Sequence, residues 1–516
     1  MNAPTDFDCI VVGAGPTGTV LAALLGQRGY RVLVVERDAQ VYPLPRAVHL
    51  DHEIARVLQQ VGVLDRLLPS MSPVTEYRFQ NAAGDVLLHN VVPLGEAVSG
   101  WAASYMFVQP ELEQALRTRL GEIGGVTTRF DCACIDLRQD SDGVEVDVRD
   151  WAGDVQTVRG AWLVGCDGAS SFVRGRLGVV VEDLGFDEPW VVIDTKTKAD
   201  IGLPDTIAYQ FCDPARPTTC VPAGPGRRRW EFMLLPGETR EAIVEPESVR
   251  RLLEPWGGED ALEIVRVAVY RFHALLARRW RVERVLLAGD AAHQMPPFMG
   301  QGLCSGVRDA ANLAWKLDLV LRGNAPEWLL DTYQAERAPH VRQIVETSVA
   351  MGRIVCVQDA DRAAERDAFM IDARRRGQDS LGRGQGGQAA LLERGIVRSG
   401  TPGAGKLFPQ PSCTRAGRSG RLDDLVGTDV RLVVAGGFEP KERPRATVVS
   451  LGCGEDAFVE TAGPKAAAWL AEHGAVAALV RPDHYVYGTA ATAGAAAELV
   501  DSFWSDVTND TSSTGE

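Results

Sequence analysis

Three glycines near the N-terminus have the spacing that a nucleotide-binding turn requires. Gly13, Gly15 and Gly18 lie in the run Gly13-Ala-Gly15-Pro-Thr-Gly18. In such a turn the first glycine permits a tight bend and the second lets the backbone approach a pyrophosphate. The third allows close packing of helix on strand. Glu36 ends the next apolar run, where a carboxylate can bind a ribose. The pattern predicts a dinucleotide site rather than a plain glycine turn.

Two later motifs repeat this arrangement of an apolar run that leads into a glycine-containing turn. The carboxylates Asp167 and Asp290 stand at the start of these turns. In chain order the motifs are Asp167-Gly-Ala-Ser-Ser171 with Arg174, and Gly289-Asp290-Ala-Ala-His293 with Pro296-Pro297, Gly300-Gln-Gly302 and Arg308-Asp309-Ala-x-Asn312.

The elements before these turns are expected to form a parallel sheet. Phe7–Val12 reads as a buried strand, residues 19–27 as a helix and residues 31–35 as a second strand. Strands are also expected at 161–164 and 284–288, each leading into one of the later turns. Ligands bind at the carboxyl ends of strands in open α/β sheets, so the three turns are expected to meet at one ligand.

Composition limits the possible partners. The chain has 516 residues, of which 54 are basic and 69 acidic, and its net charge is −15. This balance argues against nucleic acid or an anionic membrane surface as the main partner. No apolar run approaches the length of a membrane span. The ten cysteines include no Cys-x-x-Cys pair, which is typical of reduced thiols in a cytoplasmic protein.

One cluster has the residue types of a metal site. It is His49-x-Asp51-His52-Glu53, which follows the Arg46 segment and opens a predicted helix. A capped helix start with charged side chains explains the cluster better than a metal does. We therefore expect no metal ion.

Taken together, the motifs resemble those of the class A flavoprotein aromatic hydroxylases, the para-hydroxybenzoate hydroxylase superfamily. The resemblance covers about residues 7–345 and is most specific over 289–317. Within that family the chain is most similar to the 3-(3-hydroxyphenyl)propionate hydroxylase and polyketide-tailoring branch. The stretches that carry this similarity include Pro45-Arg46-Ala47, Val108-Gln109-Pro110, Cys212-Asp213-Pro214-x-Arg216-Pro217 and Arg229-Trp-Glu-Phe-x-Leu-x-Pro-Gly-Glu238.

The resemblance implies FAD as cofactor and assigns residues to it. Glu36 would bind the adenosine ribose, and Arg46 and Gln109 the ribityl–pyrophosphate region. Asp290 would hold the ribityl hydroxyls. Asp167 and Arg174 would serve FAD or a transient NAD(P)H contact. The full expected cofactor-binding set is Gly13, Gly15, Gly18, Glu36, Arg37, Arg46, Gln109, Asp167, Asp290, Pro297, Gly300, Gly302 and Leu303.

Three of these residues are expected beside the reacting part of the flavin. The amides of Gly302 and Leu303 would face the pyrimidine edge and stabilise negative charge there. Pro297 would place its carbonyl beside the reacting carbon. Phe298 and Met299 follow directly and are candidate substrate contacts, together with Tyr209 from the inserted sheet. Weaker candidates are Phe211, Tyr270 and His273. The group that activates the phenol is not assigned.

The resemblance also implies the reaction. A single-component monooxygenase would use NAD(P)H and O2 to hydroxylate a small phenolic substrate through a flavin C4a-hydroperoxide. The same chemistry on a quinone-like or polyketide-derived substrate, including ring cleavage, stays open. The choice between NADH and NADPH stays open as well, and so does a homodimer. A halogenase is disfavoured because no Trp-x-Trp motif occurs, and intact cofactor motifs argue against a flavin-binding module without turnover.

The expected fold is α/β, with three structural units. A Rossmann-like FAD-binding domain would comprise residues 1–75, 100–184 and 274–372, and an antiparallel substrate domain residues 76–99 and 185–273. A linker is expected over 373–405, and a disordered tail over 509–516. Residues 406–508 resemble the thioredoxin-like domain of this branch, but without a Cys-x-x-Cys pair disulfide chemistry is not expected there.

Overall fold

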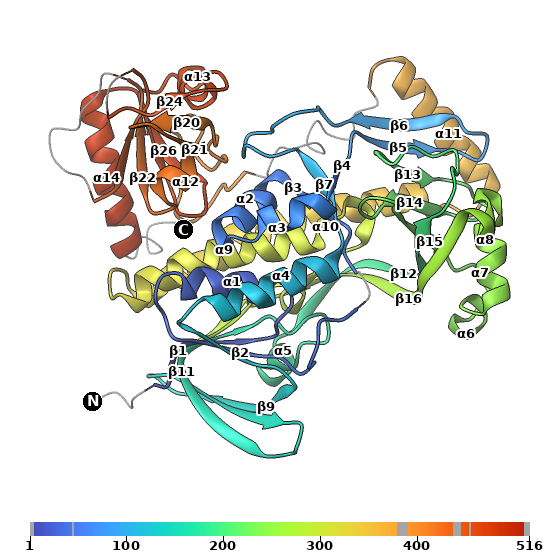
Figure 1. Cartoon of the computed structure of the whole chain (residues 1–516), viewed down its shortest axis with the longest axis horizontal. Coiled ribbons are helices and arrows are strands. Elements are labelled where there is room, and N and C mark those ends of the chain that lie inside the picture. The colour runs from blue at the N-terminus through green and yellow to red at the C-terminus, as the bar shows by residue number, and fades with distance from the viewer. Residues whose placement is uncertain (1–4, 44–45, 379–390, 437–444, 454–455, 510–516) are drawn as a thin grey trace.

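The structure is a computed structural model that describes residues 5–43, 46–378, 391–436, 445–453 and 456–509. Its first sheet follows the order β17-β18-β11-β1-β2-β8, in which β17 is the short strand Arg281–Val282. Figure 1 labels β1, β2 and β11 of this sheet. The parallel strands in it are β1 (Phe7–Val12), β2 (Val32–Val35), β8 (Val126–Arg129), β11 (Val155–Gly165) and β18 (Val285–Leu287). All of β2 and most of β1 are buried, as expected for apolar strands covered on both faces. The predicted parallel sheet is confirmed.

Helices cover this sheet and bring its turns together. The helix α1 (Pro16–Gly26) follows the glycine turn and packs against α9 (Gly302–Leu321). The two helices approach closely at Gly306, where a Cβ would lie 2.2 Å from Oγ1 of Thr17. The sequence placed the start of this second helix at Asp309, which is wrong by seven residues. The glycines at its N-terminus hide the helix from a sequence reading, because they have no side chains that could contribute to a repeat of apolar residues at helical spacing.

A second sheet of mainly antiparallel strands forms the other large layer, in the order β19-β16-β12-β15-β14-β13-β5-β6 (Figure 1). This is the antiparallel sheet that the sequence predicted between the parts of the nucleotide domain. One of its faces packs on short helices around Trp230, Phe232 and Trp256. Its strands are β5 (Glu76–Gln80), β6 (Val86–Val91), β12 (Val181–Thr197), β13 (Ile207–Phe211), β14 (Thr218–Pro222), β15 (Arg227–Met233), β16 (Leu262–Ala277) and β19 (His293–Gln294).

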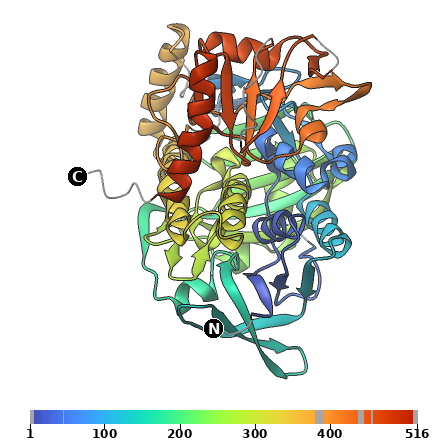
Figure 2. The same cartoon turned by 90° about the vertical axis from the view of Figure 1, so that its left-hand side faces the viewer.

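The C-terminal part folds around a four-stranded sheet in the order β23-β22-β25-β26. It packs on α9, where Trp315 and Phe503 have ring centroids 6.3 Å apart (Figure 2). The strands are β22 (Arg431–Val434), β23 (Thr447–Ser450), β25 (Ala477–Val480) and β26 (Val486–Ala490), with helices α13 (Lys465–Glu472) and α14 (Ala493–Thr508). The sequence did not predict β26.

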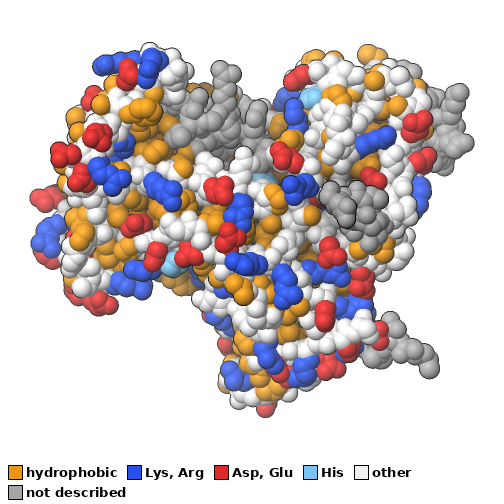
Figure 3. Space-filling view, turned by 180° about the vertical axis from the view of Figure 1, so that it is seen from behind, with side chains coloured by type: hydrophobic (Ala, Val, Ile, Leu, Met, Phe, Trp, Pro, Cys, Tyr) orange, Lys and Arg blue, Asp and Glu red, His pale blue; other side chains and the backbone are white. Residues whose placement is uncertain are grey.

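The structure describes only parts of the expected linker, 373–405, and of the expected tail, 509–516. The helix α11 (Ala360–Arg375) extends into the segment that was expected to be linker. Residues 379–390 of that segment and 510–516 of the expected tail lie outside the described residues, and the domain boundaries stay predictions. No helix of the described ranges is long and apolar enough to cross a membrane. Acidic and basic side chains are interspersed on the face shown in Figure 3.

Candidate functional site

A cavity of about 1810 Å³ joins the turns of the parallel sheet to the inner face of the second sheet. All three predicted turns contribute to its lining, with Gly15, Asp167 and Asp290 among the lining residues. Pockets for single drug-sized ligands usually measure about 300–1,000 Å³. The cavity is therefore large enough for a dinucleotide together with a second small molecule.

The glycine turn has the backbone geometry that each glycine was expected to provide. Gly13 has a φ of +106°, and a Cβ there would lie 2.4 Å from the carbonyl oxygen of Cys166. A Cβ on Gly18 would lie 2.1 Å from the carbonyl oxygen of Gly13. A Cβ on Gly15 would meet nothing within 4 Å, although this residue precedes the first turn of α1. The middle glycine thus faces open space at a helix N-terminus, where a phosphate binds favourably.

Glu36 lies at the end of β2 with its carboxylate held by two backbone amides. Its Oε2 accepts a hydrogen bond from the amide of Ala14 at 2.7 Å, and its Oε1 accepts one from the amide of Asp38 at 2.9 Å. Arg37 and Asp38 line the same part of the cavity. The carboxylate therefore ties the glycine turn to β2 and stays beside the space where a ribose would lie.

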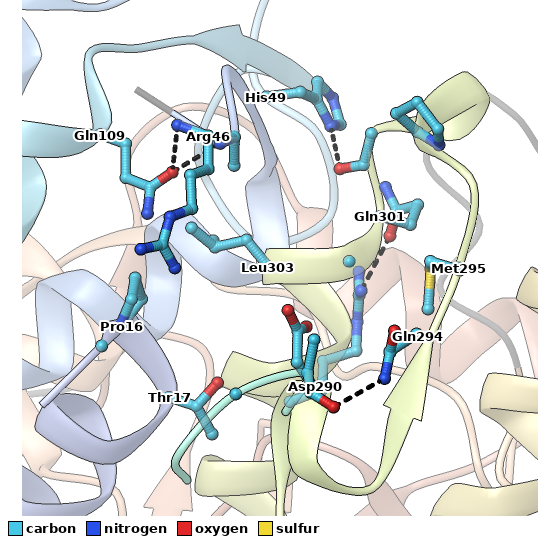
Figure 4. A pocket seen from close by; sticks show the side chains of 18 of the residues that line it. Pro16, Thr17, Arg46, His49, Gln109, Asp290, Gln294, Met295, Gln301 and Leu303 are labelled. Carbon is cyan, nitrogen blue, oxygen red and sulfur yellow. Dashed lines mark hydrogen bonds between the residues drawn. The ribbon is translucent and has the colours of Figure 1, made fainter. Parts of the chain in front are cut away.

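Gln109 orients the segment that carries Arg46. Its Oε1 accepts hydrogen bonds from the amides of Arg46 at 2.9 Å and Ala47 at 2.5 Å (Figure 4). Its Nε2 donates to Glu113 at 2.6 Å. The guanidinium of Arg46 lies over the ring of Tyr42, with its carbon 4.8 Å from the centroid, and lines the cavity. Gln109 therefore fixes the backbone of the Arg46 segment at the cavity wall.

Asp290 lies in the turn after β18, with its carboxylate open to the cavity. The position of Asp290 deep inside the molecule raises the pKa of its side chain, because a charged carboxylate is poorly hydrated there. A ligand that donates hydroxyl hydrogen bonds would restore that lost stabilisation. Figure 4 shows Asp290 on the same side of the cavity as Thr17 and Gln294.

Asp167 and Arg174 are engaged in holding the turns themselves. Asp167 accepts from the hydroxyl of Ser171 at 2.5 Å and from the amide of Val173 at 3.0 Å. Arg174 donates to the carbonyls of Ala291 at 2.9 Å and Ala169 at 2.7 Å. Arg174 thus clamps the second turn to the third and is not among the residues that line the cavity, whereas Asp167 lines it.

The segment from Pro297 to Leu303 lines the cavity along its whole length. Gly300 has a φ of +63°, and a Cβ there would lie 2.8 Å from the Cβ of His49. Gly302 begins α9, and Leu303 points into the cavity (Figure 4). Amides at a helix start lack intrahelical partners and carry partial positive charge. This end of the segment can therefore stabilise an anionic ring edge.

A hydrogen-bonded chain behind this segment was not foreseen. Nδ1 of His49 lies 3.0 Å from the carbonyl oxygen of Gly300, and Nε2 lies 2.9 Å from Oγ of Ser104. The hydroxyl of Tyr77 lies 2.7 Å from the same Oγ. Burial lowers the pKa of His49, so its ring is neutral at pH 7 and donates to Gly300. No sequence spacing links these four residues, because they come from four separate segments of the chain.

The cluster from His49 to Glu53 includes a capped helix start, as the sequence predicted. Asp51 caps the helix α2 (His52–Val61) by accepting from the amides of Glu53 at 3.1 Å and Ile54 at 3.2 Å. Arg308 pairs with both Asp51 and Glu53. The described residues contain no group of three or more His, Cys, Asp or Glu side chains that could hold a metal ion.

The candidate substrate residues separate into two groups. Met299 and Phe298 line the cavity, although Phe298 also packs against Trp190 with centroids 5.7 Å apart. Tyr209 lies on the far face of the second sheet, where its ring stacks on Phe211 at 5.5 Å. The expectation that Tyr209 contacts the substrate is therefore not supported. The weaker candidates Tyr270 and His273 line the cavity, but Phe211 does not.

Comparison with known proteins identifies the family. Residues 6–348 match the family model described as "FAD binding domain". The chain belongs to this FAD-binding family. The match covers more than half of this flavoprotein and includes the three turns and all eight strands of the second sheet.

Similarity to known proteins covers most of the length of this flavoprotein. A "Probable NADH-specific resorcinol 4-hydroxylase" of Rhodococcus jostii (strain RHA1) is 40% identical, with 96% of this chain and 94% of the relative covered. A "3-(3-hydroxy-phenyl)propionate/3-hydroxycinnamic acid hydroxylase" of Klebsiella pneumoniae subsp. pneumoniae is 36% identical, with 82% and 77% covered. The family and these relatives make the chain an FAD-dependent aromatic hydroxylase, which confirms the resemblance seen in the sequence.

Solved structures agree in fold. The crystal structure of aklavinone-11 hydroxylase with FAD and aklavinone has a TM-score of 0.79 at 25% identity, covering 98% of this chain and 99% of the other. The flavin-dependent monooxygenase PieE has a TM-score of 0.82 at 24% identity, with the same coverage. Because both likenesses include the C-terminal part, the flavoprotein shares its whole arrangement with these enzymes.

The residues of the cavity fit FAD. The open space at Gly15, the helix N-terminus of α1 and the carboxylate of Glu36 suit its adenosine and pyrophosphate groups. The carboxylate of Asp290 faces the continuation of that space. The N-terminus of α9 then lies where a ring with an anionic edge can be stabilised.

Proposed function

We propose that this hydroxylase adds one oxygen atom of O2 to the ring of a small phenol, with NADH as the electron donor. In balance, the phenol, O2, NADH and one proton give the ring-hydroxylated phenol, NAD⁺ and water. The observation that carries the proposal is the cavity that the three turns share with one face of the second sheet. The full-length similarity to a relative named as an NADH-specific resorcinol hydroxylase supports a small phenol and NADH.

Bound FAD supplies hydride acceptance and oxygen activation, and the chain supplies position and electrostatics. The glycine turn and Glu36 would hold its adenosine end, and Asp290 its ribityl hydroxyls. The amides of Gly302 and Leu303 would stabilise negative charge at the ring edge. Pro297 would shape the ring surface that faces the substrate.

The second sheet would exclude water from the reacting atoms. Its strands carry Val192, Val221 and Phe79 into the wall of the cavity that Phe298 and Met299 also line. A partly apolar wall keeps water away from the reacting atoms and so prevents side reactions with water. The same wall would hold the substrate ring against the segment that begins at Pro297.

A polyketide-derived or quinone-like substrate is the second candidate. The observation that favours it is the likeness in fold to the aklavinone-11 hydroxylase complex over nearly the whole chain. The volume of the cavity would accommodate a ring system larger than a phenol. Identity to this structure is 25%, whereas the relative named for resorcinol is 40% identical, so we place the small phenol first.

The purified yellow protein tests the proposal. NADH oxidation and oxygen uptake would be measured with resorcinol, other phenols, phenolic acids and a tricyclic polyketide, and products would be identified by mass spectrometry. We expect a small phenol to stimulate NADH oxidation and to gain 16 mass units. NADH oxidation that yields only H2O2 with every phenol, or hydroxylation of the polyketide alone, would contradict the proposal.

A further inference from the structure

We infer that Glu231 accepts the proton of the substrate hydroxyl, and that the wall around it selects an uncharged phenol over one that carries a carboxylate. This inference rests on the proposed function and deepens it. Glu231 lies on β15, and its side chain was not singled out from the sequence. It contributes to the lining of the same cavity as Asp290 and Pro297.

The register of the second sheet places Glu231 in a row that faces the cavity. It pairs with Val192 of β12 on one side and with Thr219 of β14 on the other. Thr219 in turn pairs with Gln210 of β13. All of these residues line the cavity, whereas Trp230, the neighbour of Glu231, lies in the core on the opposite face. Alternation along a strand therefore directs the carboxylate towards the ligand space.

Glu231 is buried and yet lacks a donor. Its exposed fraction is 6%, and its carboxylate forms no hydrogen bond or ion pair with any part of the chain that the structure describes. Its neighbours in the row satisfy each other, since the hydroxyl of Thr219 donates to Gln210 at 2.5 Å. A buried carboxylate without a donor is costly. A phenolic hydroxyl in the cavity would supply the missing hydrogen bond.

The charges around Glu231 suit it to accept a proton near neutral pH. Burial raises its pKa to about 7, while Arg229 lowers it, Asp194 raises it and Arg266 lowers it. Arg229 is already paired with Asp194 at 2.8 Å, and Arg266 lies 3.4 Å from the same carboxylate. A general base is most effective when its pKa lies near the working pH.

In the proposed step the phenolic O–H bond breaks and the proton forms a bond to a carboxylate oxygen of Glu231. The electron pair stays on the phenolic oxygen and makes the ring more electron-rich at the positions that are attacked. The proton is returned to water after the product leaves, so Glu231 begins the next turnover as a carboxylate. No oxidant beyond O2 and no further reductant is needed for this step.

The same wall disfavours an anionic substrate. Among the described residues of the second sheet that line the cavity, the arginines Arg229 and Arg271 are paired with Asp194 and Asp187. A carboxylate brought to this wall would meet Glu231, and these arginines already have partners. Burial of two like charges at one site is unfavourable. An uncharged phenol or dihydroxybenzene avoids this cost.

The test compares Glu231→Gln with the wild type and with Glu263→Gln, an exposed glutamate of the same sheet that pairs with Lys196. FAD content and the far-UV spectrum establish that each variant is folded and loaded. The measurements are kcat and KM for hydroxylation as a function of pH, and binding of resorcinol, 3-hydroxybenzoate and 3-(3-hydroxyphenyl)propionate.

We expect the wild-type kcat to rise with pH through about 7, because Glu231 must be unprotonated to accept a proton. Glu231→Gln should lower kcat by about 100-fold and lose this pH dependence, while Glu263→Gln keeps both. The wild type should bind resorcinol with a lower Kd than either acid. In Glu231→Gln the difference in Kd between resorcinol and the acids should be smaller.

Two results would overturn the inference while leaving the proposed function intact. One is hydroxylation by Glu231→Gln with the rate and pH profile of the wild type, and the other is a wild-type preference for the phenolic acids. If the wild type hydroxylates no phenol at all, the proposed function falls, and the inference falls with it.

Discussion

The hydroxyl of Tyr485 donates a hydrogen bond to Glu53 at 2.8 Å, and this contact joins the C-terminal part to the first turn of α2. Glu53 also accepts from Arg308 at 2.6 Å, and Arg308 donates to Gln301 at 2.9 Å. Gln301 is the residue before α9, whose first amides were assigned to the flavin ring. The C-terminal part therefore supports the position of the segment that we propose holds the flavin ring.

Tyr485→Phe tests this support. Loss of one hydrogen bond to a buried carboxylate should lower the free energy of unfolding by about 1–3 kcal/mol and weaken FAD binding several-fold. Tyr487→Phe is the matched control, because the hydroxyl of Tyr487 bonds Asp506 inside the C-terminal part at 2.5 Å. FAD titration of both variants separates the two effects. Equal FAD affinity in both would show that Tyr485 contributes to stability alone.

Gly15→Ala and Gly18→Ala should fail in different ways. A methyl group on Gly15 enters open space, so the protein should fold with nearly normal stability but bind FAD at least about tenfold more weakly. A methyl group on Gly18 collides with the carbonyl of Gly13, so it should destabilise the fold by about 2–3 kcal/mol. Thermal unfolding of the apoproteins and FAD titration would be compared. Normal FAD binding by Gly15→Ala would contradict the assigned pyrophosphate position.

Asp290→Ala should retain FAD poorly. The carboxylate faces the cavity, and hydrogen bonds to a charged group contribute about 1.5–3 kcal/mol, which corresponds to roughly 10–100-fold in affinity. Asp290→Asn should fall between this variant and the wild type, because an amide oxygen still accepts. Asp154→Ala, in an exposed hairpin, is the control. FAD retained after gel filtration is the measurement, and normal retention by Asp290→Ala would refute the role.

Acid should destabilise the contact between α10 (Asp331–Val355) and the C-terminal part. Burial alone would raise the pKa of Glu336, but Arg481 at 2.7 Å and Lys316 at 2.9 Å outweigh it and lower this pKa to about 2. The unfolded value is 4.5, so the folded state binds the proton less readily. The stabilisation is therefore complete above pH 4.5 and is lost as the pH falls towards 2, by about 3 kcal/mol.

Glu336→Gln tests this pH dependence. The variant should be less stable than the wild type at pH 7, because Arg481 and Lys316 lose their charged partner. Its stability should change less between pH 5 and pH 3 than that of the wild type. Glu346→Gln on the exposed face of the same helix is the control. Denaturant unfolding at each pH is the measurement, and parallel curves for wild type and Glu336→Gln would contradict the prediction.

The sequence predicted the parts of the site that depend on backbone geometry. Gly13 and Gly18 are constrained by contacts that a Cβ would block, and such contacts leave a fixed spacing in the chain. The position of Glu36 was predicted from the same strand–turn–helix–strand unit, because the lengths of α1 and β2 fix its distance from the glycine turn along the chain. These constraints are local, so a single sequence displays them.

The substrate wall was harder to predict because it depends on which face of a strand points inward. Tyr209 is aromatic and lies on the right strand, but the register turns it away from the cavity. Glu231 could have been found from alternation, since Trp230 and Phe232 mark the opposite face of β15. The chain through His49 and Ser104 has no such signal, because it arises only when separate elements pack.

The strands β12 and β16 are paired along most of their length, from beside the third turn to the substrate wall. Such continuous pairing resists sliding of one strand past the other, so we expect the second sheet and the nucleotide turns to move together rather than to open as two separate bodies. Its register shifts between Asp183 and Asp187, where Gly185 has a φ of +76°, and again between Asp194 and Thr195. Strands bend at such irregularities. We therefore expect substrate and product to enter and leave without a hinge opening between the second sheet and the nucleotide turns.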